Sequence, residues 1–158
     1  MALLADGLRC GRLRSLKRLS LAEAQIGPQG APALTKRALP SLLALYLETS
    51  QIGGAGLTTL APALRQLPKL ETLSLRGNEI TDQGLASLLA PPTAGVLPSL
   101  ATLWLDGNQI TDEGCATLAS ALRGGALPTM QRYYNLRLSG NPASAAAQQA
   151  VEAEMRTR

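Results

Sequence analysis

The chain has 158 residues, of which 46% are apolar, and its formal net charge is +4. This length suffices for a single domain with a hydrophobic core. Histidine is absent, so the commonest general base and the commonest zinc ligand are missing, and Ser-His-Asp and Cys-His catalytic arrangements are excluded.

The N-terminal segment concentrates the positive charge. Within residues 1–18, Asp6 is the only acid, and the basic residues are Arg9, Arg12, Arg14, Lys17 and Arg18. Such a block can bind nucleic acid or an acidic partner, or it can be a solvated end surface or a junction with further repeats. We favour the solvated surface or junction because no aromatic residue interleaves the block, and we therefore do not expect nucleic-acid binding.

From Leu16 onward, one pattern recurs five times. It reads L-x-x-L-x-L-x-x-N-x-I-x-x-x-G, and it is complete in residues 70–84 and 100–114. The fifth copy ends at its Asn position. That position holds, in chain order, Ala24, Ser50, Asn78, Asn108 and Asn141, at spacings of 26, 28, 30 and 33 residues. Self-similarity at such a period predicts a stack of similar units, each burying its apolar side against its neighbours.

Each unit is predicted to be a short strand followed by a returning helix. The x-L-x-L segment alternates with period two, as in a strand with its leucines on one face. After the turn, apolar residues recur at helical spacing, as do Leu57, Leu60 and Leu64. Asp82 and Asp112 stand where a helix N-cap is expected.

The asparagines of the pattern are interpreted as structural. A buried Asn side chain at this position can bond the backbone of adjacent turns with both its donors and its acceptor. Ala24 cannot make these bonds, and Ser50 can make only some of them.

The two ends differ. Leu3, Leu4 and Leu8 suggest a helix that lacks its strand, so we expect residues 1–15 to be a partial repeat, in a fragment of a longer protein or in a subunit covered by a neighbour. Residues 16–141 hold the repeats. In residues 142–158 we expect a C-terminal capping helix, with Pro142 at its first position. The whole chain is thus predicted to be one domain.

One uncharged segment is long enough to span a bilayer. Residues 84–105 contain no charged side chain. They keep the repeat register, however, and they include Pro91, Pro92, Gly95 and Pro98. We interpret the segment as helix, loop and strand of the repeat stack, and we predict no membrane span.

The pattern resembles the leucine-rich repeat, specifically the ribonuclease-inhibitor-like class, on the residues from Leu70 to Gly84 and from Leu100 to Gly114. The resemblance covers roughly residues 3–156. It implies an α/β solenoid of about five repeats, with a parallel sheet on the concave face and helices on the convex face. Proteins of this kind mostly bind other proteins on the concave face, and some activate small GTPases.

The strand positions not occupied by leucine should form rows across that face, about 4.8 Å apart. One row reads Ser20, Tyr46, Ser74, Trp104 and Arg137; the next reads Ala22, Glu48, Arg76, Asp106 and Ser139; a third begins with Arg18. Exposed aromatic side chains beside arginines are typical of interface hot spots. The partner-binding candidates are therefore Arg18, Tyr46, Glu48, Ser74, Arg76, Trp104, Asp106 and Arg137.

Two features of these rows leave alternatives open. Glu48, Arg76 and Asp106 alternate in sign, so they can form cross-strand ion pairs, which we favour, or meet a charged partner. Residues 132–135 contain a three-residue insertion predicted to bulge beside Trp104 and Arg137. Tyr133 and Tyr134 within it can extend the aromatic surface or pack over a sheet edge.

No phosphate-binding loop, metal cluster or catalytic constellation is present in the sequence, and we expect no cofactor and no enzyme activity. Cys10 and Cys115 are too far apart for a local metal site, and unpaired cysteines favour an intracellular, cytoplasmic location. We predict a non-catalytic protein–protein interaction module. The alternatives are a structural subunit of a larger assembly, or a GTPase-regulating or nucleic-acid-binding solenoid.

Overall fold

The computed structural model describes residues 15–30, 39–90, 96–130 and 135–157. Within these residues, one sheet of five parallel strands follows the chain order. The strands are β1 (Arg18–Ser20), β2 (Ala44–Tyr46), β3 (Thr72–Ser74), β4 (Thr102–Trp104) and β5 (Leu136–Arg137). The helices are α3 (Gly53–Arg65), α4 (Asp82–Leu89), α5 (Asp112–Arg123) and α6 (Ala145–Arg156), and residues 27–30 are also helical.

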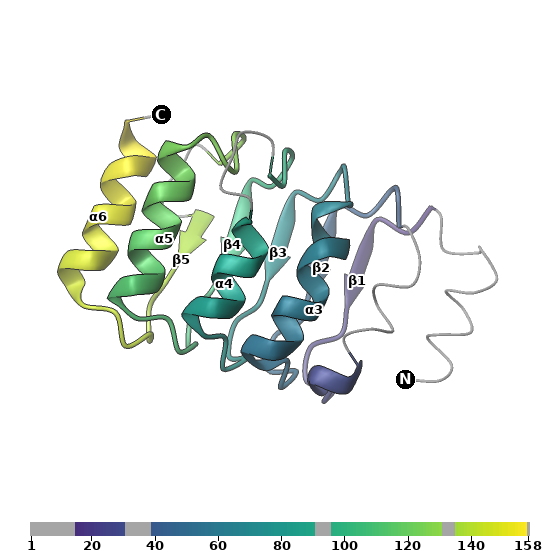
Figure 1. The fold of residues 1–158 in the computed structure, drawn as a ribbon. Coiled ribbons are helices and arrows are strands. Elements are labelled where there is room, and N and C mark those ends of the chain that lie inside the picture. The colour runs from purple at the N-terminus through teal and green to yellow at the C-terminus, as the bar shows by residue number, and fades with distance from the viewer. Residues whose placement is uncertain (1–14, 31–38, 91–95, 131–134, 158) are drawn as a thin grey trace.

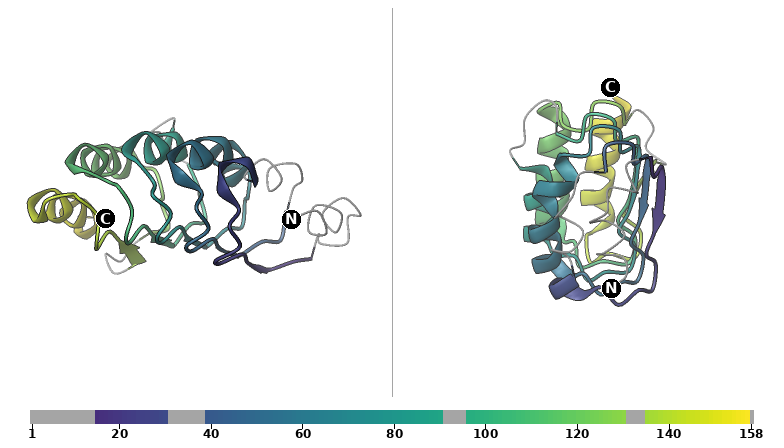
Figure 2. Two further views of the ribbon diagram at one scale, coloured as in Figure 1. Left: turned by 90° about the horizontal axis from the view of Figure 1, so that it is seen from below. Right: turned by 90° about the vertical axis from the view of Figure 1, so that its right-hand side faces the viewer.

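The molecule has two layers, a sheet and a row of helices. In Figure 1 the strands succeed one another across the molecule, and α3 to α6 accompany them in the same order. The left view of Figure 2 shows the helices in one row and the strands in another. Strands and helices alternate along the chain, so the predicted α/β solenoid is confirmed. One side of the sheet faces away from the helices, and we call this side the open face.

Leucines of the strands form the centre of the core. Leu45, Leu73 and Leu103 lie opposite one another on neighbouring strands and are 4%, 0% and 0% exposed. The strand leucines therefore all point toward the helices, as the period-two alternation predicted. Because each leucine packs between its own helix and the neighbouring repeats, no unit buries its apolar side alone.

The helix N-caps are one residue earlier than predicted. Thr81 and Thr111, not Asp82 and Asp112, are the N-cap residues of α4 and α5, and their hydroxyls accept hydrogen bonds from first-turn N–H groups. The aspartates instead reach the next repeat. Asp82 accepts from the backbone N (2.9 Å) and hydroxyl (2.6 Å) of Thr111, and Asp112 accepts likewise from Ser144 (2.6 and 2.9 Å). Each carboxylate thus holds the N-cap residue of the next helix in place.

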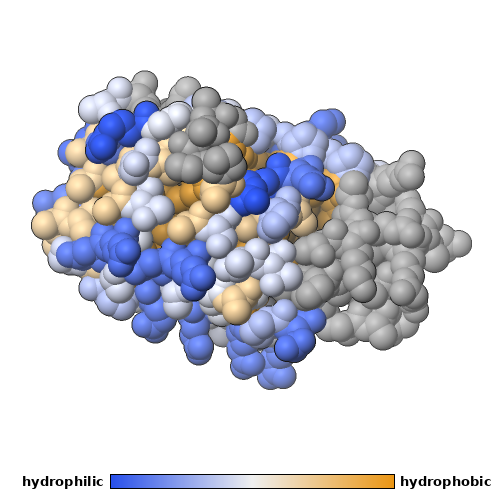
Figure 3. All heavy atoms as spheres, viewed as in Figure 1, coloured by the Kyte–Doolittle hydropathy of each residue, from blue (hydrophilic) through white to orange (hydrophobic). Residues whose placement is uncertain are grey.

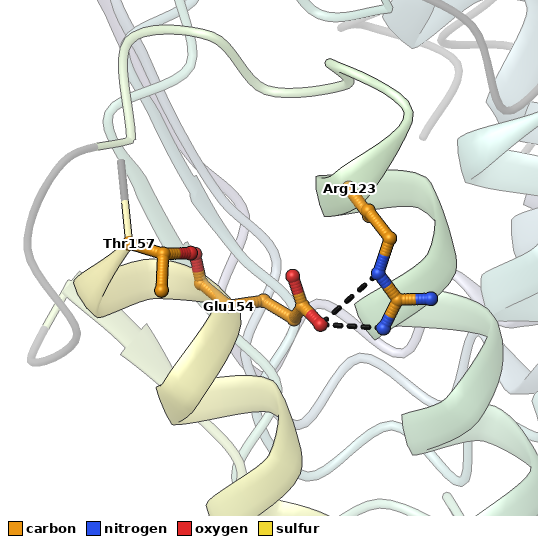
Figure 4. A network of polar contacts seen from close by, with 3 residues as sticks. All are labelled: Arg123, Glu154 and Thr157. Atoms are coloured by element: carbon orange, nitrogen blue, oxygen red, sulfur yellow. Dashed lines mark hydrogen bonds and ion pairs between the residues drawn. The ribbon is translucent and has the colours of Figure 1, made fainter.

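The C-terminal helix α6 (Ala145–Arg156) lies within the predicted residues 142–158, but it starts later than predicted. Its N-cap is Ser144, whose hydroxyl accepts from the backbone N of Ala147 at 3.2 Å. Pro142 precedes this cap and is not the first helical residue, because Ser144 takes the cap position that Thr111 occupies one repeat earlier. At the other end of α6, Glu154 accepts hydrogen bonds from the guanidinium of Arg123, which ties α6 to α5 (Figure 4).

The asparagine ladder is confirmed in detail. Asn108 is 2% exposed, and its side-chain oxygen accepts from the backbone N of Asn78 and of Ile80, both at 3.0 Å. Its amide nitrogen donates to the carbonyl oxygens of Leu75 (3.0 Å) and Leu105 (2.9 Å). One side chain therefore satisfies four buried backbone groups from two adjacent turns.

The ladder weakens toward the N-terminus, also as predicted. The Ser50 hydroxyl lies 2.7 Å from the carbonyl oxygen of Leu21 and 3.1 Å from that of Glu48. A hydroxyl has a single hydrogen to donate, whereas the amide of Asn78 donates to carbonyls of both adjacent turns. The first two turns are therefore joined by fewer side-chain bonds than the later ones.

The uncharged segment of residues 84–105 does not form one long helix in its described parts. It includes α4 from Gly84 to the end of the helix at Leu89, and it includes β4, which begins at Thr102. Over the parts of the chain that the structure describes, no helix is both long enough and apolar enough to cross a bilayer.

Several sequence predictions fall on residues outside the described ranges. These are residues 1–14 of the partial repeat predicted in residues 1–15, with Arg9, Cys10, Arg12 and Arg14, the loop prolines Pro91 and Pro92, and the insertion tyrosines Tyr133 and Tyr134. They remain predictions.

Helices α3 and α4 lie close together at two glycines, Gly54 and Gly84. A Cβ atom added at Gly84 would lie 3.0 Å from both the Cα and the carbonyl oxygen of Gly54. We therefore expect Gly84→Ala to lower the free energy of unfolding by about 1–3 kcal/mol, although alanine favours helix. Urea denaturation measures this, with Gln83→Ala, an exposed neighbour, as the control. Equal stability of the two variants would contradict the close contact.

Candidate functional site

The open face carries the predicted rows of side chains. The parallel register places Ser20, Tyr46, Ser74, Trp104 and Arg137 opposite one another across the five strands. Ser20 and Arg137 are exposed, and Tyr46 and Trp104 are half-buried. The structure thus brings the only tryptophan of the chain into one row with a tyrosine and an arginine.

Ser74 corrects the prediction that this whole row is accessible. It is 0% exposed, because a small side chain in this register lies between the much larger Tyr46 and Trp104 on the neighbouring strands. Its hydroxyl has no hydrogen-bond partner among the described residues. Ser74 therefore cannot contact a partner directly.

Trp104 and Arg137 form a stacked pair. The guanidinium carbon of Arg137 lies 4.6 Å from the centroid of the Trp104 ring. Stacking of this kind contributes about 0.5–1 kcal/mol at exposed sites. It also restricts the long arginine side chain to one region of the open face, beside the edge of the sheet at β5.

The favoured ion pairs of the second row are not formed. Within the described residues, Arg76 makes no ion pair with either Glu48 or Asp106. Asp106 instead accepts a hydrogen bond from the hydroxyl of Ser139. Exposed charges one strand apart gain little from pairing, so their long side chains are free to orient toward solvent.

A depression lies at the C-terminal end of the open face. It has a volume of about 390 Å³ and is lined by Arg76, Asp106, Gly107, Arg137, Ser139 and Gly140. Sequence reasoning missed the contribution of the two glycines, which turn with φ of +64° and +71° and lie beside one another. A glycine stands directly before the Asn position in both repeats, and this recurrence is the sequence signal that would have indicated the turn.

The remaining candidate positions lie apart from this depression. Arg18 is exposed on β1, opposite Ala44, and β1 is the sheet edge opposite to β5. Glu48 is half-buried just after β2. The structure thus brings Arg76, Asp106 and Arg137 together at the depression, with Trp104 stacked on Arg137, and it does not bring Arg18 to them.

On the helix side, Arg123 pairs with Glu154 and Arg156 pairs with Glu152. Figure 3 shows the helix side, where hydrophilic residues lie around a broad area of apolar residues. The described residues contain no group of three or more potential metal ligands. Cys115 is 1% exposed, and burial, followed by the nearby Asp112 and Asp82, raises the pKa of its thiol, so it is a poor nucleophile.

The alternating strands and helices define an α/β solenoid, and comparison with family models identifies its repeats. A model of two leucine-rich repeats matches residues 68–115, and a model of a single leucine-rich repeat matches residues 12–34. The fold is therefore a leucine-rich repeat solenoid. A search of curated proteins found no match.

Proposed function

We propose that this protein is a non-catalytic interaction module that binds another protein through the open face of its sheet. Leucine-rich repeats generally mediate protein–protein interaction. The observation that carries the proposal for this chain is the cluster of Trp104, Arg137, Arg76 and Asp106, whose charges are not neutralised by ion pairs among the described residues. Half-buried aromatics beside arginines are the usual anchors of protein interfaces.

We further propose the ribonuclease-inhibitor-like class and an intracellular location. The class is supported by helices of 8 to 13 residues following the strands of the described repeats. The location is supported by Cys115, a buried free thiol of the kind that reducing compartments maintain.

Removal of the anchors tests the proposed function. In a pull-down from a cell lysate, Tyr46→Ala/Trp104→Ala/Arg137→Ala should lose specific partners that the natural chain retains, because these side chains form one row. A triple variant on exposed helix positions, Thr59→Ala/Gln83→Ala/Glu113→Ala, is the matched control and should retain them. Trp104→Ala alone should weaken binding and leave the melting temperature nearly unchanged.

The same experiment separates the alternatives. A structural subunit held by its helices would lose partners in the helix-face variant and keep them in the open-face variant. If both variants retained the partners, the open face would be excluded as the binding site. A large drop in the melting temperature of Trp104→Ala would show instead that Trp104 is structural.

A further inference from the structure

The depression at the C-terminal end of the open face has an uneven charge. Two arginines, Arg76 and Arg137, and a single acid, Asp106, line it. Both arginines are exposed, and neither makes an ion pair within the described residues. The carboxylate of Asp106 is already engaged by the hydroxyl of Ser139. The lining therefore has one positive charge in excess, which an anionic group of a partner would balance.

The two guanidinium groups can reach a common point. Arg76 follows β3 and Arg137 lies on β5, so a single strand separates them, a distance of about 10 Å at strand spacing. Two extended arginine side chains span such a gap from both sides. The face of the Arg137 guanidinium is covered by the Trp104 ring, which leaves the N–H groups at its edge to donate. Planar, paired donors of this kind match a carboxylate.

Asp106 distinguishes a peptide from a phosphate-bearing ligand. A nucleic-acid backbone carries a negative charge on every nucleotide, so a phosphate next to the one held by the arginines would be repelled by Asp106. An extended peptide presents carboxylates for the arginines and also backbone N–H groups, from which Asp106 can accept hydrogen bonds. The ring of Trp104, which stacks on the lining residue Arg137, adds a surface for an apolar side chain next to the acid.

We propose that Arg76 and Arg137 together bind a carboxylate of an acidic peptide segment of the partner, with an apolar neighbour of that acid packed on Trp104. This rests on the proposed function, since it names the chemistry of the partner segment at the same face.

The first experiment selects ligands from a random library, so it does not require the partner to be identified. Short random peptides displayed on phage are selected against the whole immobilised chain. The bound peptides should be enriched in Asp and Glu, and depleted in Lys and Arg, relative to the unselected library. Selected peptides that are neutral or basic would overturn the proposal, and so would the absence of any selected peptide.

The second experiment locates the binding. Trp104 is the only tryptophan, so its fluorescence reports on a tryptophan-free acidic peptide from the selection. Arg76→Gln and Arg137→Gln should each weaken binding about tenfold, as should replacement of the peptide carboxylates by amides. Lys69→Gln removes the same charge from an exposed site outside the depression and should leave the affinity unchanged. Equal weakening by Lys69→Gln would show a diffuse charge effect and overturn the proposal.

The remaining outcomes separate this proposal from the function it rests on. Cellular partners lost with Trp104→Ala but kept with Arg76→Gln/Arg137→Gln would overturn the carboxylate site and leave the open-face function standing. An RNA oligonucleotide that bound with the same dependence on both arginines would overturn the assignment to a peptide.

Discussion

Asn108→Ala is expected to lower the free energy of unfolding by roughly 3–5 kcal/mol. The substitution removes the acceptor of two buried N–H groups, those of Asn78 and Ile80. It also removes one of the two asparagine donors to the carbonyl oxygens of Leu75 and Leu105, which still accept from Asn78 and Asn141, respectively. A buried polar group without a partner costs about 1–3 kcal/mol, partly offset by any water that enters. Urea denaturation monitored by circular dichroism gives the change in free energy.

Asn141→Ala is the matched control. Asn141 makes the same types of bond, accepting from Ile110 at 3.0 Å and donating to Leu105 and Leu138 at 2.8 Å each. It is only half-buried, so water can replace part of what is lost, and the cost should be about 1–2 kcal/mol. If both variants lost the same free energy, burial would not be the reason for the large effect at Asn108.

Leu103→Ala is expected to have a similarly large effect, about 2–5 kcal/mol. Its side chain is 0% exposed at the centre of the sheet, and the deletion leaves a cavity bounded by strands and helices that hold one another in place. The melting temperature and the urea midpoint should both fall. The far-ultraviolet circular dichroism spectrum before unfolding should remain that of the natural chain.

Leu136→Ala tests whether position in the stack sets this cost. Leu136 lies opposite Leu103 on the neighbouring strand, but it is half-buried at the edge of the sheet. Less apolar area is lost there, and the site can relax, so we expect about 1 kcal/mol. A cost at Leu136 equal to that at Leu103 would contradict the account of β5 as a terminal strand.

The sequence predicted the features that recur in every unit. The spacing of Leu45, Leu73 and Leu103 determined both the strand positions and their register, because a shift by one residue would turn every leucine away from the helices. The role of Asn108 followed from its donor and acceptor geometry. These features depend on the backbone of a unit and its neighbours, which the recurring pattern specifies.

Other features depend on which side chains two adjacent repeats bring into contact, and the recurring pattern does not specify these side chains. Ser74 is buried because Tyr46 and Trp104 flank it, and no property of serine predicts that. Asp82 bonds Thr111 across repeats, whereas a local pattern suggested a cap for its own helix. Arg76 forms no ion pair with Glu48 or Asp106 among the described residues, because ion pairing depends on side-chain conformations that sequence spacing does not determine.

The arrangement of contacts between elements has a mechanical consequence. Within the described residues, helices pack on the next helix in the chain, α3 on α4, α4 on α5 and α5 on α6, and strands pair in the same order. Each unit therefore contacts only the units before and after it in the chain. A local loss of structure affects a distant unit only through the units that lie between them. A ligand bound by residues of both β3 and β5 would connect two units that do not contact each other directly. It would thereby stabilise the C-terminal half of the molecule against local unfolding.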